Sequence, residues 1–213
     1  MNLSECDSIL LFGGSFDPPH RAHVKLPLLA RQAIGAEVVA YIPAACPPLK
    51  TGPVLTPANH RLHMLELALR DQPRAVILTD EIDRRENDEP SYTIDTLERL
   101  RRKLGEKPVF RLLIGTDQLR VFDRWRSFRR ILELAEPLVM LRPPDTRRRL
   151  LSELPTGFDP AQWMARLVDL PRMDISSTKV RQRLAAGEAI DDLVPPAVAT
   201  YIRRNNLYQD RST

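Results

Sequence analysis

Short runs of apolar residues alternate along the chain with segments in which apolar residues recur at helical spacing. Each run is almost continuously apolar, which is typical of strands that are buried on both faces. The pattern predicts five strands, at residues 8–12, 37–42, 75–79, 109–114 and 137–141.

Five helices are predicted between and after these strands. The first occupies residues 21–34, and two more lie near the C-terminus, at residues 176–186 and 195–205. The region 43–57 carries five prolines and predicts a long loop. The other two helices follow capping signals.

Thr56 is the expected cap of the second helix, with Pro57 at its first position. Ser91 is the expected cap of the third. Apolar residues lie on one face of each helix: Leu62, Leu65 and Leu69 in the second, and Ile94, Leu97, Leu100 and Leu104 in the third.

Strands that are separated by helices favour an α/β fold with a doubly wound parallel sheet, covered on both faces. Ligands in such folds bind beyond the carboxyl ends of the strands, where the strand order reverses. The 213 residues are enough for a single domain. We expect a core at about residues 8–170 and a small C-terminal helical part at about residues 171–208.

The composition is ordinary for a globular protein, with 43% hydrophobic and 28% charged residues. No stretch approaches the ~18–20 uninterrupted apolar residues of a membrane span. The N-terminus is acidic where a secretory signal would be basic, and Cys6 and Cys46 are far apart. These features predict a cytoplasmic protein with reduced thiols and no membrane partner.

The excess of cations is small, 32 Lys and Arg against 28 acids, for a net charge of +4. It suits an anionic small molecule as well as a nucleic acid. The basic clusters at residues 101–103, 129–130 and 147–149 lack the interleaved aromatic residues of nucleic-acid binders. We interpret them as solvated helix faces and expect no nucleic-acid partner.

The richest candidate chemistry follows the first predicted strand, in the segment GGSFDPPHRAH at residues 13–23. Gly13 and Gly14 allow close approach of a ligand, and backbone N–H groups at the following helix start suit phosphate. His20 and His23 are three apart, so both rings can face the same space. As neutral donors or as cations, they suit stabilisation of a phosphoryl oxyanion.

Simpler interpretations exist for these features. A glycine pair after a strand is often only a turn, and an HxxH can be half of a metal site, although no nearby Cys or Glu completes one here. The GxGxxG fingerprint of dehydrogenases is absent. A second HxxH, His60 and His63, lies inside an amphipathic helix with no glycine loop before it, and we interpret it as structural.

The segment GGSFDPPHRAH resembles the GG(T/S)FDPxHxGH signature of the nucleotidylyltransferase superfamily, and in particular of bacterial nicotinate-nucleotide adenylyltransferases. Residues 175–181, ISSTKVR, are similar to the second signature of that superfamily, ISSTxxR. Four further segments resemble motifs of the family: PPLK at 47–50, SYTIDTL at 91–97, IGTD at 114–117 with Trp125, and RP at 142–143. The resemblance covers about residues 8 to 208.

The resemblance implies a Rossmann-like nucleotidyltransferase fold and the transfer of AMP from ATP to nicotinate mononucleotide, with release of pyrophosphate, in NAD biosynthesis. The attacking phosphate is already an anion, so positioning and charge stabilisation should suffice without a covalent intermediate. Mg²⁺ held mainly by the ATP phosphates is the implied cofactor, and no metal site built by the protein alone is expected.

The resemblance also assigns residues to each substrate. The catalytic residues would be His20, His23 and Arg181. The residues expected to bind ATP are Gly13, Gly14, Ser15, Phe16, His20, His23, Gly115, Asp117, Arg142, Ile175, Ser176, Ser177, Thr178 and Arg181. Those expected to bind the mononucleotide are Ser15, Lys50, Tyr92, Thr93, Val121 and Trp125.

Within the mononucleotide site, Trp125 would stack on the pyridine ring. Backbone amides near Thr93 and Val121 would hold the carboxylate, and Lys50 would meet the phosphate. Asp17 would brace the first loop.

Two positions depart from the family pattern. Ala22 replaces the Gly of HxGH, which adds a methyl where backbone and phosphates approach, so we expect ATP binding to be retained but altered. Leu49 replaces the His of PPHK, which removes one polar contact to the mononucleotide.

Other functions also fit the sequence. One is an adenylyltransferase for nicotinamide mononucleotide or another phosphorylated acceptor. Another is a nucleotide-binding regulator with weakened catalysis, and an RNA-binding module on the same fold is a third. The sequence leaves the oligomeric state and the choice between acid and amide open.

Overall fold

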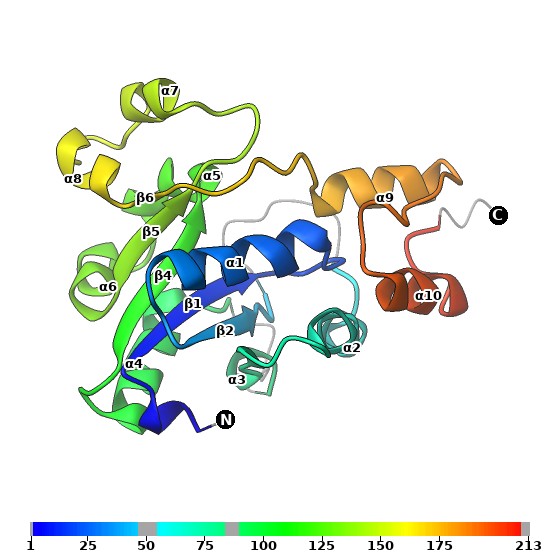
Figure 1. The fold of residues 1–213 in the computed structure, drawn as a ribbon, viewed down its shortest axis with the longest axis horizontal. Coiled ribbons are helices and arrows are strands. Elements are labelled where there is room, and N and C mark those ends of the chain that lie inside the picture. The colour runs from blue at the N-terminus through cyan, green and yellow to red at the C-terminus, as the bar shows by residue number, and fades with distance from the viewer. Residues whose placement is uncertain (1, 47–54, 84–89, 210–213) are drawn as a thin grey trace.

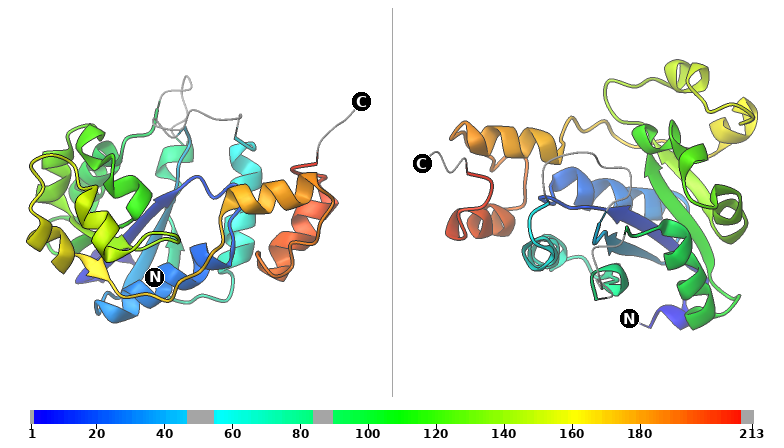
Figure 2. Two further views of the ribbon diagram at one scale, coloured as in Figure 1. Left: turned by 90° about the horizontal axis from the view of Figure 1, so that it is seen from above. Right: turned by 180° about the vertical axis from the view of Figure 1, so that it is seen from behind.

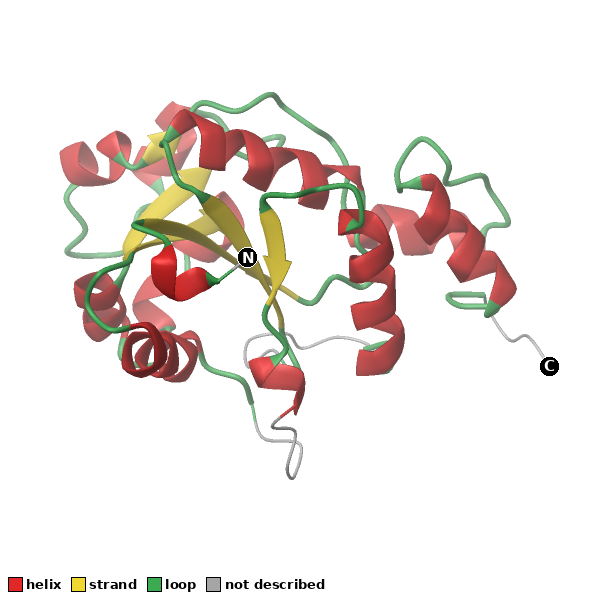
Figure 3. Cartoon of the chain, turned by 60° about the horizontal axis from the view of Figure 1, so that its bottom comes forward, coloured by secondary structure: helices red, strands yellow, loops and turns green. Residues whose placement is uncertain are grey.

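A computed structural model describes residues 2–46, 55–83 and 90–209 of the chain. Its centre is a sheet of six parallel strands with helices on both sides (Figures 1 and 3). The strands are β1 (Ser8–Gly14), β2 (Val38–Pro43), β3 (Ala75–Ile77), β4 (Val109–Gly115), β5 (Glu136–Met140) and β6 (Leu167–Val168). The predicted α/β class with a parallel sheet is therefore confirmed.

Helices connect and follow these strands. The α-helices are α1 (Arg21–Ala33), α2 (Ala58–Leu69), α3 (Asp80–Asp83), α4 (Thr93–Leu104), α5 (Thr116–Leu119), α6 (Phe128–Leu134), α7 (Arg147–Ser152), α8 (Pro160–Ala165), α9 (Ser177–Ala185) and α10 (Pro196–Arg204). Two short 3₁₀ helices are η1 (Leu3–Glu5) and η2 (Phe122–Arg124). No helix in the described part of the chain is long and apolar enough to cross a membrane.

The strand order is β3-β2-β1-β4-β5-β6. The chain builds outward from β1 in one direction through β3, then returns to the other side of β1 with β4. The order therefore reverses between β1 and β4, and the crevice for ligands in such a sheet lies beyond the carboxyl ends of these two strands. Gly13 and Gly14 end β1, and Gly115 ends β4.

Alternate residues of each strand pack on opposite faces of the sheet. Ile9 and Leu11 join a cluster that contains the apolar faces of α4 and α6. Leu10 and Phe12 join a second cluster with α1 and with part of α2. Both faces are thus covered, which explains why the strands are continuously apolar.

A third apolar cluster lies between α2 and the C-terminal helices. Met64 and Ala68 of α2 pack there against Val180 of α9 and against Val198 and Ile202 of α10. Figures 1 and 2 show α9 and α10 beside α2, away from the β5–β6 side of the sheet. The two predicted C-terminal helices are therefore present, and α2 contributes to two clusters at once.

Several local predictions differ from the structure. The strand β6 and the short helices α3, α5, α6, α7 and α8 were not predicted. Pro57 and Tyr92, one residue beyond Thr56 and Ser91, are the N-caps of α2 and α4, and neither helix has a side-chain cap. Thr56 instead donates its backbone N–H to Asp17, and Ser91 donates its own to the carbonyl of Cys46. Their side-chain hydroxyls interact with Tyr208 and Glu81, respectively, so neither hydroxyl caps a helix.

Candidate active site

The loop after β1 is built around a buried aromatic ring. Phe16 adopts the left-handed region at φ 48° and is 1% exposed. A Cβ atom on Gly14 would lie only 3.1 Å from this ring, so glycine leaves the space that the ring occupies. The ring in turn meets His23 edge-on, with centroids 5.1 Å apart. Gly13 is exposed, so its backbone is open to a ligand.

His20 and His23 cap the start of α1 reciprocally. The Nδ1 atom of His20 accepts the backbone N–H of His23, and Nδ1 of His23 accepts the N–H of His20, both at 3.3 Å. The rings stack with centroids 3.5 Å apart and planes 15° from parallel. Because each Nδ1 accepts, the neutral form of each ring carries its proton on Nε2. The pair therefore offers two Nε2–H donors at a helix N-terminus.

Burial sets the charge state of His20. The residue is 4% exposed, and burial followed by the field of Arg142 lowers its pKa to about 3. The sequence left open whether this imidazole is neutral or cationic. At neutral pH it is a neutral donor.

The second motif starts α9 and is tied to the first loop. Ser176 is the N-cap and accepts the N–H of Lys179 at 3.1 Å. Ser177 donates its hydroxyl to the carbonyl of Pro18 at 2.9 Å. Arg181, one turn later, donates to the carbonyl of Asp17 at 2.6 Å and to the hydroxyl of Thr178 at 3.3 Å. Two segments far apart in sequence thus form one side of the site. Ile175 precedes this cap and packs against both the second and third apolar clusters.

A third group lies at the ends of β4 and β5. Arg142 approaches Asp117 to 3.5 Å, and both side chains are about half exposed. They converge over Gly115, where a Cβ atom would lie 2.7 Å from Nε of Arg142 and still closer to the Asp117 carboxylate. The structure therefore brings Gly115, Asp117 and Arg142 together, as the resemblance implied.

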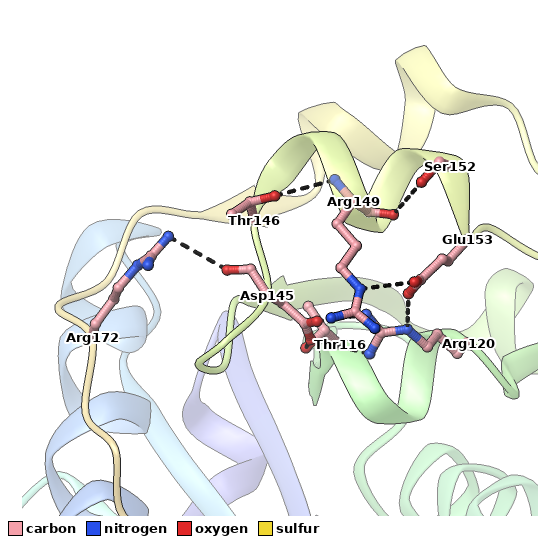
Figure 4. Close-up of polar contacts among 8 residues, drawn as sticks. All are labelled: Thr116, Arg120, Asp145, Thr146, Arg149, Ser152, Glu153 and Arg172. Atoms are coloured by element: carbon pink, nitrogen blue, oxygen red, sulfur yellow. Dashed lines mark hydrogen bonds and ion pairs between the residues drawn. The ribbon is translucent and has the colours of Figure 1, made fainter.

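A buried carboxylate braces this group (Figure 4). Asp145 accepts the hydroxyl of Thr116 and two hydrogen bonds from Arg120, at 2.6 and 3.0 Å. Its backbone N–H donates to the carbonyl of Arg142 at 2.8 Å. The hydrogen bonds from Arg120 hold the pKa of Asp145 below its ordinary value. Arg120 also contacts Glu153 at 2.5 Å, which ties the end of α7 to the same point.

The residues expected to hold the mononucleotide base lie around the start of α4. Trp125 is partly buried against Phe122, with ring centroids 5.0 Å apart. The neighbouring Arg126 reaches back over the ring of Tyr92 at 4.8 Å. The segment with Trp125 therefore lies next to the N-terminus of α4, where Thr93 is the first helical residue.

Val121 fits its expected role less directly. Its backbone N–H donates to the carbonyl of Gln118 at 3.2 Å, so this amide is already engaged within its own turn. The N-terminus of α4 is a better donor, because no side chain caps it.

Two hydrogen bonds connect this group to the first loop. The carbonyl of Gly14 accepts the N–H of Ala44, and the carbonyl of Cys46 accepts the N–H of Ser91, each at 2.9 Å. The segment after β2 thus lies between the two groups. Lys50 and Leu49 are outside the described residues.

Sequence reasoning missed Arg61, which organises this region. The residue lies on α2, is 1% exposed, and donates to the carbonyls of Ser15, Ala44 and Thr56 at 2.8, 2.8 and 2.9 Å. A further contact reaches the carbonyl of Ala45 at 3.4 Å. An arginine in an amphipathic helix normally faces solvent, so no local pattern could distinguish it.

Ala22 differs from its expected placement. Its side chain is 6% exposed and packs in the second apolar cluster, with Phe12 and Leu26. The added methyl therefore lies in the core, and the expectation that it crowds the phosphate space loses its basis.

The second histidine pair contacts the C-terminal helices. Nδ1 of His60 and the hydroxyl of Tyr201 lie 2.8 Å apart, and the ring of His63 packs against the same tyrosine. This agrees with the structural interpretation. Within residues 2–46, 55–83 and 90–209, no three metal-binding side chains gather into a cluster.

Comparison with known proteins gives one consistent family. The chain matches the cytidylyltransferase-like family over residues 11–183. It is 40% identical over 205 residues to a Bordetella pertussis protein named "Probable nicotinate-nucleotide adenylyltransferase", across 93% of this chain and 96% of that one. A Chromobacterium violaceum protein of the same name is 35% identical over 222 residues, across 93% and 97% of the two chains.

Solved structures share the fold at lower identity. The Plasmodium falciparum nicotinic acid mononucleotide adenylyltransferase complexed with NaAD superposes with a TM-score of 0.70 at 21% identity, over 95% of this chain and 97% of that one. The same protein complexed with APC gives 0.69 at 20% identity, over the same shares. The fold and the sequence relatives agree, and the chain belongs to the cytidylyltransferase-like family, among the nicotinate-nucleotide adenylyltransferases.

Proposed function

We propose that this protein transfers AMP from ATP to nicotinate mononucleotide, forming nicotinate adenine dinucleotide and pyrophosphate in NAD biosynthesis. The observation that carries the proposal is the stacked pair His20 and His23, whose Nε2–H donors lie where the strand order reverses. The 35–40% identity to proteins named for this activity supports the choice of reaction.

In the reaction, a phosphate oxygen of the mononucleotide attacks the α-phosphorus of ATP. A new P–O bond forms as the bond between the α-phosphorus and the oxygen bridging to the β-phosphorus breaks, and pyrophosphate leaves with that electron pair. The nucleophile is already an anion, so no residue has to remove a proton. The protein has to align two polyanions and stabilise the charge that develops.

The first loop and α9 would carry the triphosphate. His20 and His23 would donate Nε2–H bonds to its oxygens, and backbone N–H groups at the starts of α1 and α9 would add positive dipole ends. Arg181 would keep its hydrogen bond to the carbonyl of Asp17 and offer its other N–H groups to the β- and γ-phosphates, because a guanidinium has five donors. Asp117 and Arg142 would contact the ribose and phosphates from the β4–β5 side.

Mg²⁺ fits this site only as an ion held by the nucleotide. The carboxylates that line it already have partners, since Asp17 accepts from Tyr208 and Thr56, and Asp117 lies beside Arg142. Of these two carboxylates, that of Asp117 is the more accessible to a metal ion, because its side chain is half exposed. When bound through phosphate oxygens and water, the ion would neutralise phosphate charge.

The start of α4 supports the acid over the amide. Its first N–H groups have no side-chain cap and would accept a carboxylate, while an amide would place an N–H₂ donor against the same donors. Arg126, next to Tyr92 and 3.8 Å from Asp95, balances the acidic residue in the first turn of this helix. Trp125 would supply the apolar surface for the pyridine ring.

An acceptor panel tests the proposal. Purified protein with ATP and Mg²⁺ is offered nicotinate mononucleotide, nicotinamide mononucleotide or phosphopantetheine, and pyrophosphate release and product mass are followed. We expect kcat/KM to be highest for nicotinate mononucleotide. No release with that acceptor would refute the proposal, and tight ATP binding without turnover would favour a regulator.

We expect the protein in the cytoplasm, where both Cys6 and Cys46 would remain thiols, as they are in the structure. A single domain and the absence of a nucleic-acid partner remain our predictions.

A further inference from the structure

The C-terminal segment, which follows α10, contacts the loop after β1 through the side chain of Tyr208. Tyr208 follows α10, and its hydroxyl donates to Oδ1 of Asp17 at 2.6 Å. Burial, and then the charge of Asp17, raise the pKa of this hydroxyl above its ordinary value, so it stays protonated and donates throughout the physiological pH range. Neither signature motif contains Tyr208, and the residue lies 191 positions from its partner.

Asp17 is the point at which four segments meet. It is 4% exposed, and its second carboxylate oxygen accepts the N–H of Thr56 at 3.2 Å, just before α2. Its carbonyl accepts from Arg181 of α9. The Tyr208 hydroxyl is the contribution of the C-terminal segment to this junction.

The position of Asp17 controls the path of the loop. It lies between Phe16, whose left-handed backbone seats its ring on His23, and His20, whose Nδ1 caps α1. A buried carboxylate oxygen that loses its donor costs free energy, which is relieved if the loop moves toward water or another donor. Such a movement would displace His20 and the carbonyl that receives Arg181.

We propose that Tyr208 is a positioning residue for the phosphate-binding loop: through Asp17, its hydroxyl holds His20 and Arg181 in the geometry that receives the triphosphate of ATP. The inference rests on the proposed function for the identity of the ligand. It makes the C-terminal segment a part of the ATP site, although no atom of Tyr208 is required to touch the nucleotide.

Tyr208→Phe tests the proposal, because it removes the hydroxyl and keeps the ring that packs against the third apolar cluster. The matched control is Tyr201→Phe, which removes the hydroxyl that meets His60 in the same helical part. Affinity for ATP and Mg²⁺ is measured by calorimetry without mononucleotide, together with kcat, both KM values and Tm.

We expect Tyr208→Phe to weaken ATP binding and raise the KM for ATP about tenfold, with the KM for the mononucleotide within twofold of wild type. Tyr201→Phe should leave ATP affinity within twofold, whatever it does to Tm. ATP affinity within twofold of wild type in Tyr208→Phe would overturn the proposal. So would equal losses in both variants that follow their loss of Tm, since these would indicate general destabilisation.

A double-mutant cycle with Asp17→Asn tests the route. If Tyr208 acts through Asp17, Tyr208→Phe should have less than a twofold further effect in the Asp17→Asn background. Full additivity would overturn the proposal. If Tyr208→Phe does not fold, Asp17→Asn alone decides, and unchanged ATP affinity in that variant would also overturn it. Calorimetry with ATP keeps this result separate from the acceptor panel, because ATP binding can be measured whichever acceptor is used.

Discussion

The imidazoles of His20 and His23 stack at 3.5 Å, and each Nδ1 accepts the backbone N–H of the other residue. The same pair of rings therefore caps α1 and presents two Nε2–H donors at its N-terminus. Capping and ligand binding use different nitrogens of each ring, so the two roles can be separated by substitution.

His20→Asn should retain the cap and lose the Nε2–H donor. Asn is a good N-cap whose side-chain oxygen can accept the N–H of His23, so Tm should change little. Loss of an oxyanion donor should lower kcat by roughly 10²-fold or more. His20→Ala should lose the same activity and about 1 kcal/mol of stability in addition. The control is His63→Asn, on the exposed side of α2, which should keep wild-type kcat. A near-normal kcat in His20→Asn would contradict the role of His20 as an oxyanion donor.

The depressed pKa of His20 predicts an acid-sensitive stability. The folded protein binds this proton only near pH 3, whereas in the unfolded chain the pKa is about 6.5. Below pH 6.5 the unfolded state therefore binds more protons, and stability falls as the pH falls toward 3, by up to about 1.4 kcal/mol per pH unit.

Denaturant unfolding at pH 7.5 and pH 5 checks this prediction. Between these values the wild type should lose about 2 kcal/mol more than His20→Asn, which lacks the titrating group. Equal losses in the two proteins would show that His20 titrates normally. Because the His20 ring stays neutral in the folded protein from pH 6 to pH 8, it should cause no step in the kcat/KM profile over that range.

Arg61 should be a large contributor to stability. Arg61→Met would leave the buried carbonyl of Ser15 and the partly buried carbonyls of Ala44 and Thr56 without this donor, and we expect the free energy of unfolding to fall by about 2–4 kcal/mol. Arg61→Lys should recover part of this, since one ammonium cannot reach every carbonyl that the planar guanidinium does. Arg70→Met, an exposed arginine at the end of α2, should change stability by less than about 0.5 kcal/mol. A loss below 1 kcal/mol in Arg61→Met would be inconsistent with its geometry.

Ala22→Gly should affect stability without affecting catalysis. The methyl is buried with Phe12 and Leu26, and glycine in a helix costs up to about 1 kcal/mol relative to alanine. The KM for ATP and kcat should stay within twofold of wild type, because the methyl lies in the core. A larger kinetic change would show that position 22 does influence the phosphate site.

Most of the sheet could be predicted from local pattern, because buried parallel strands are continuous apolar runs. β6 could not: it is two residues, Leu167 and Val168, and exists only because β5 offers an edge to pair with. Helix starts at Thr56 and Ser91 were misplaced by one residue for the same kind of reason. A cap is made by the side-chain hydroxyl, and in this fold the hydroxyls of Thr56 and Ser91 interact with Tyr208 and Glu81 instead.

The sequence by itself determined the class of fold, the two signature segments and the residue types suited to phosphate, since these depend on neighbouring positions along the chain. Only the tertiary structure decided the charge and tautomer of His20, the burial of the Ala22 methyl and the junctions made by Arg61 and Asp17. Those properties depend on desolvation and on hydrogen bonds between distant segments, such as the bond from Tyr208 to Asp17 across 191 positions. The pattern of residues along the chain shows neither the desolvation of a side chain nor its distant hydrogen-bond partners. Both arise only when the folded chain excludes water from the site.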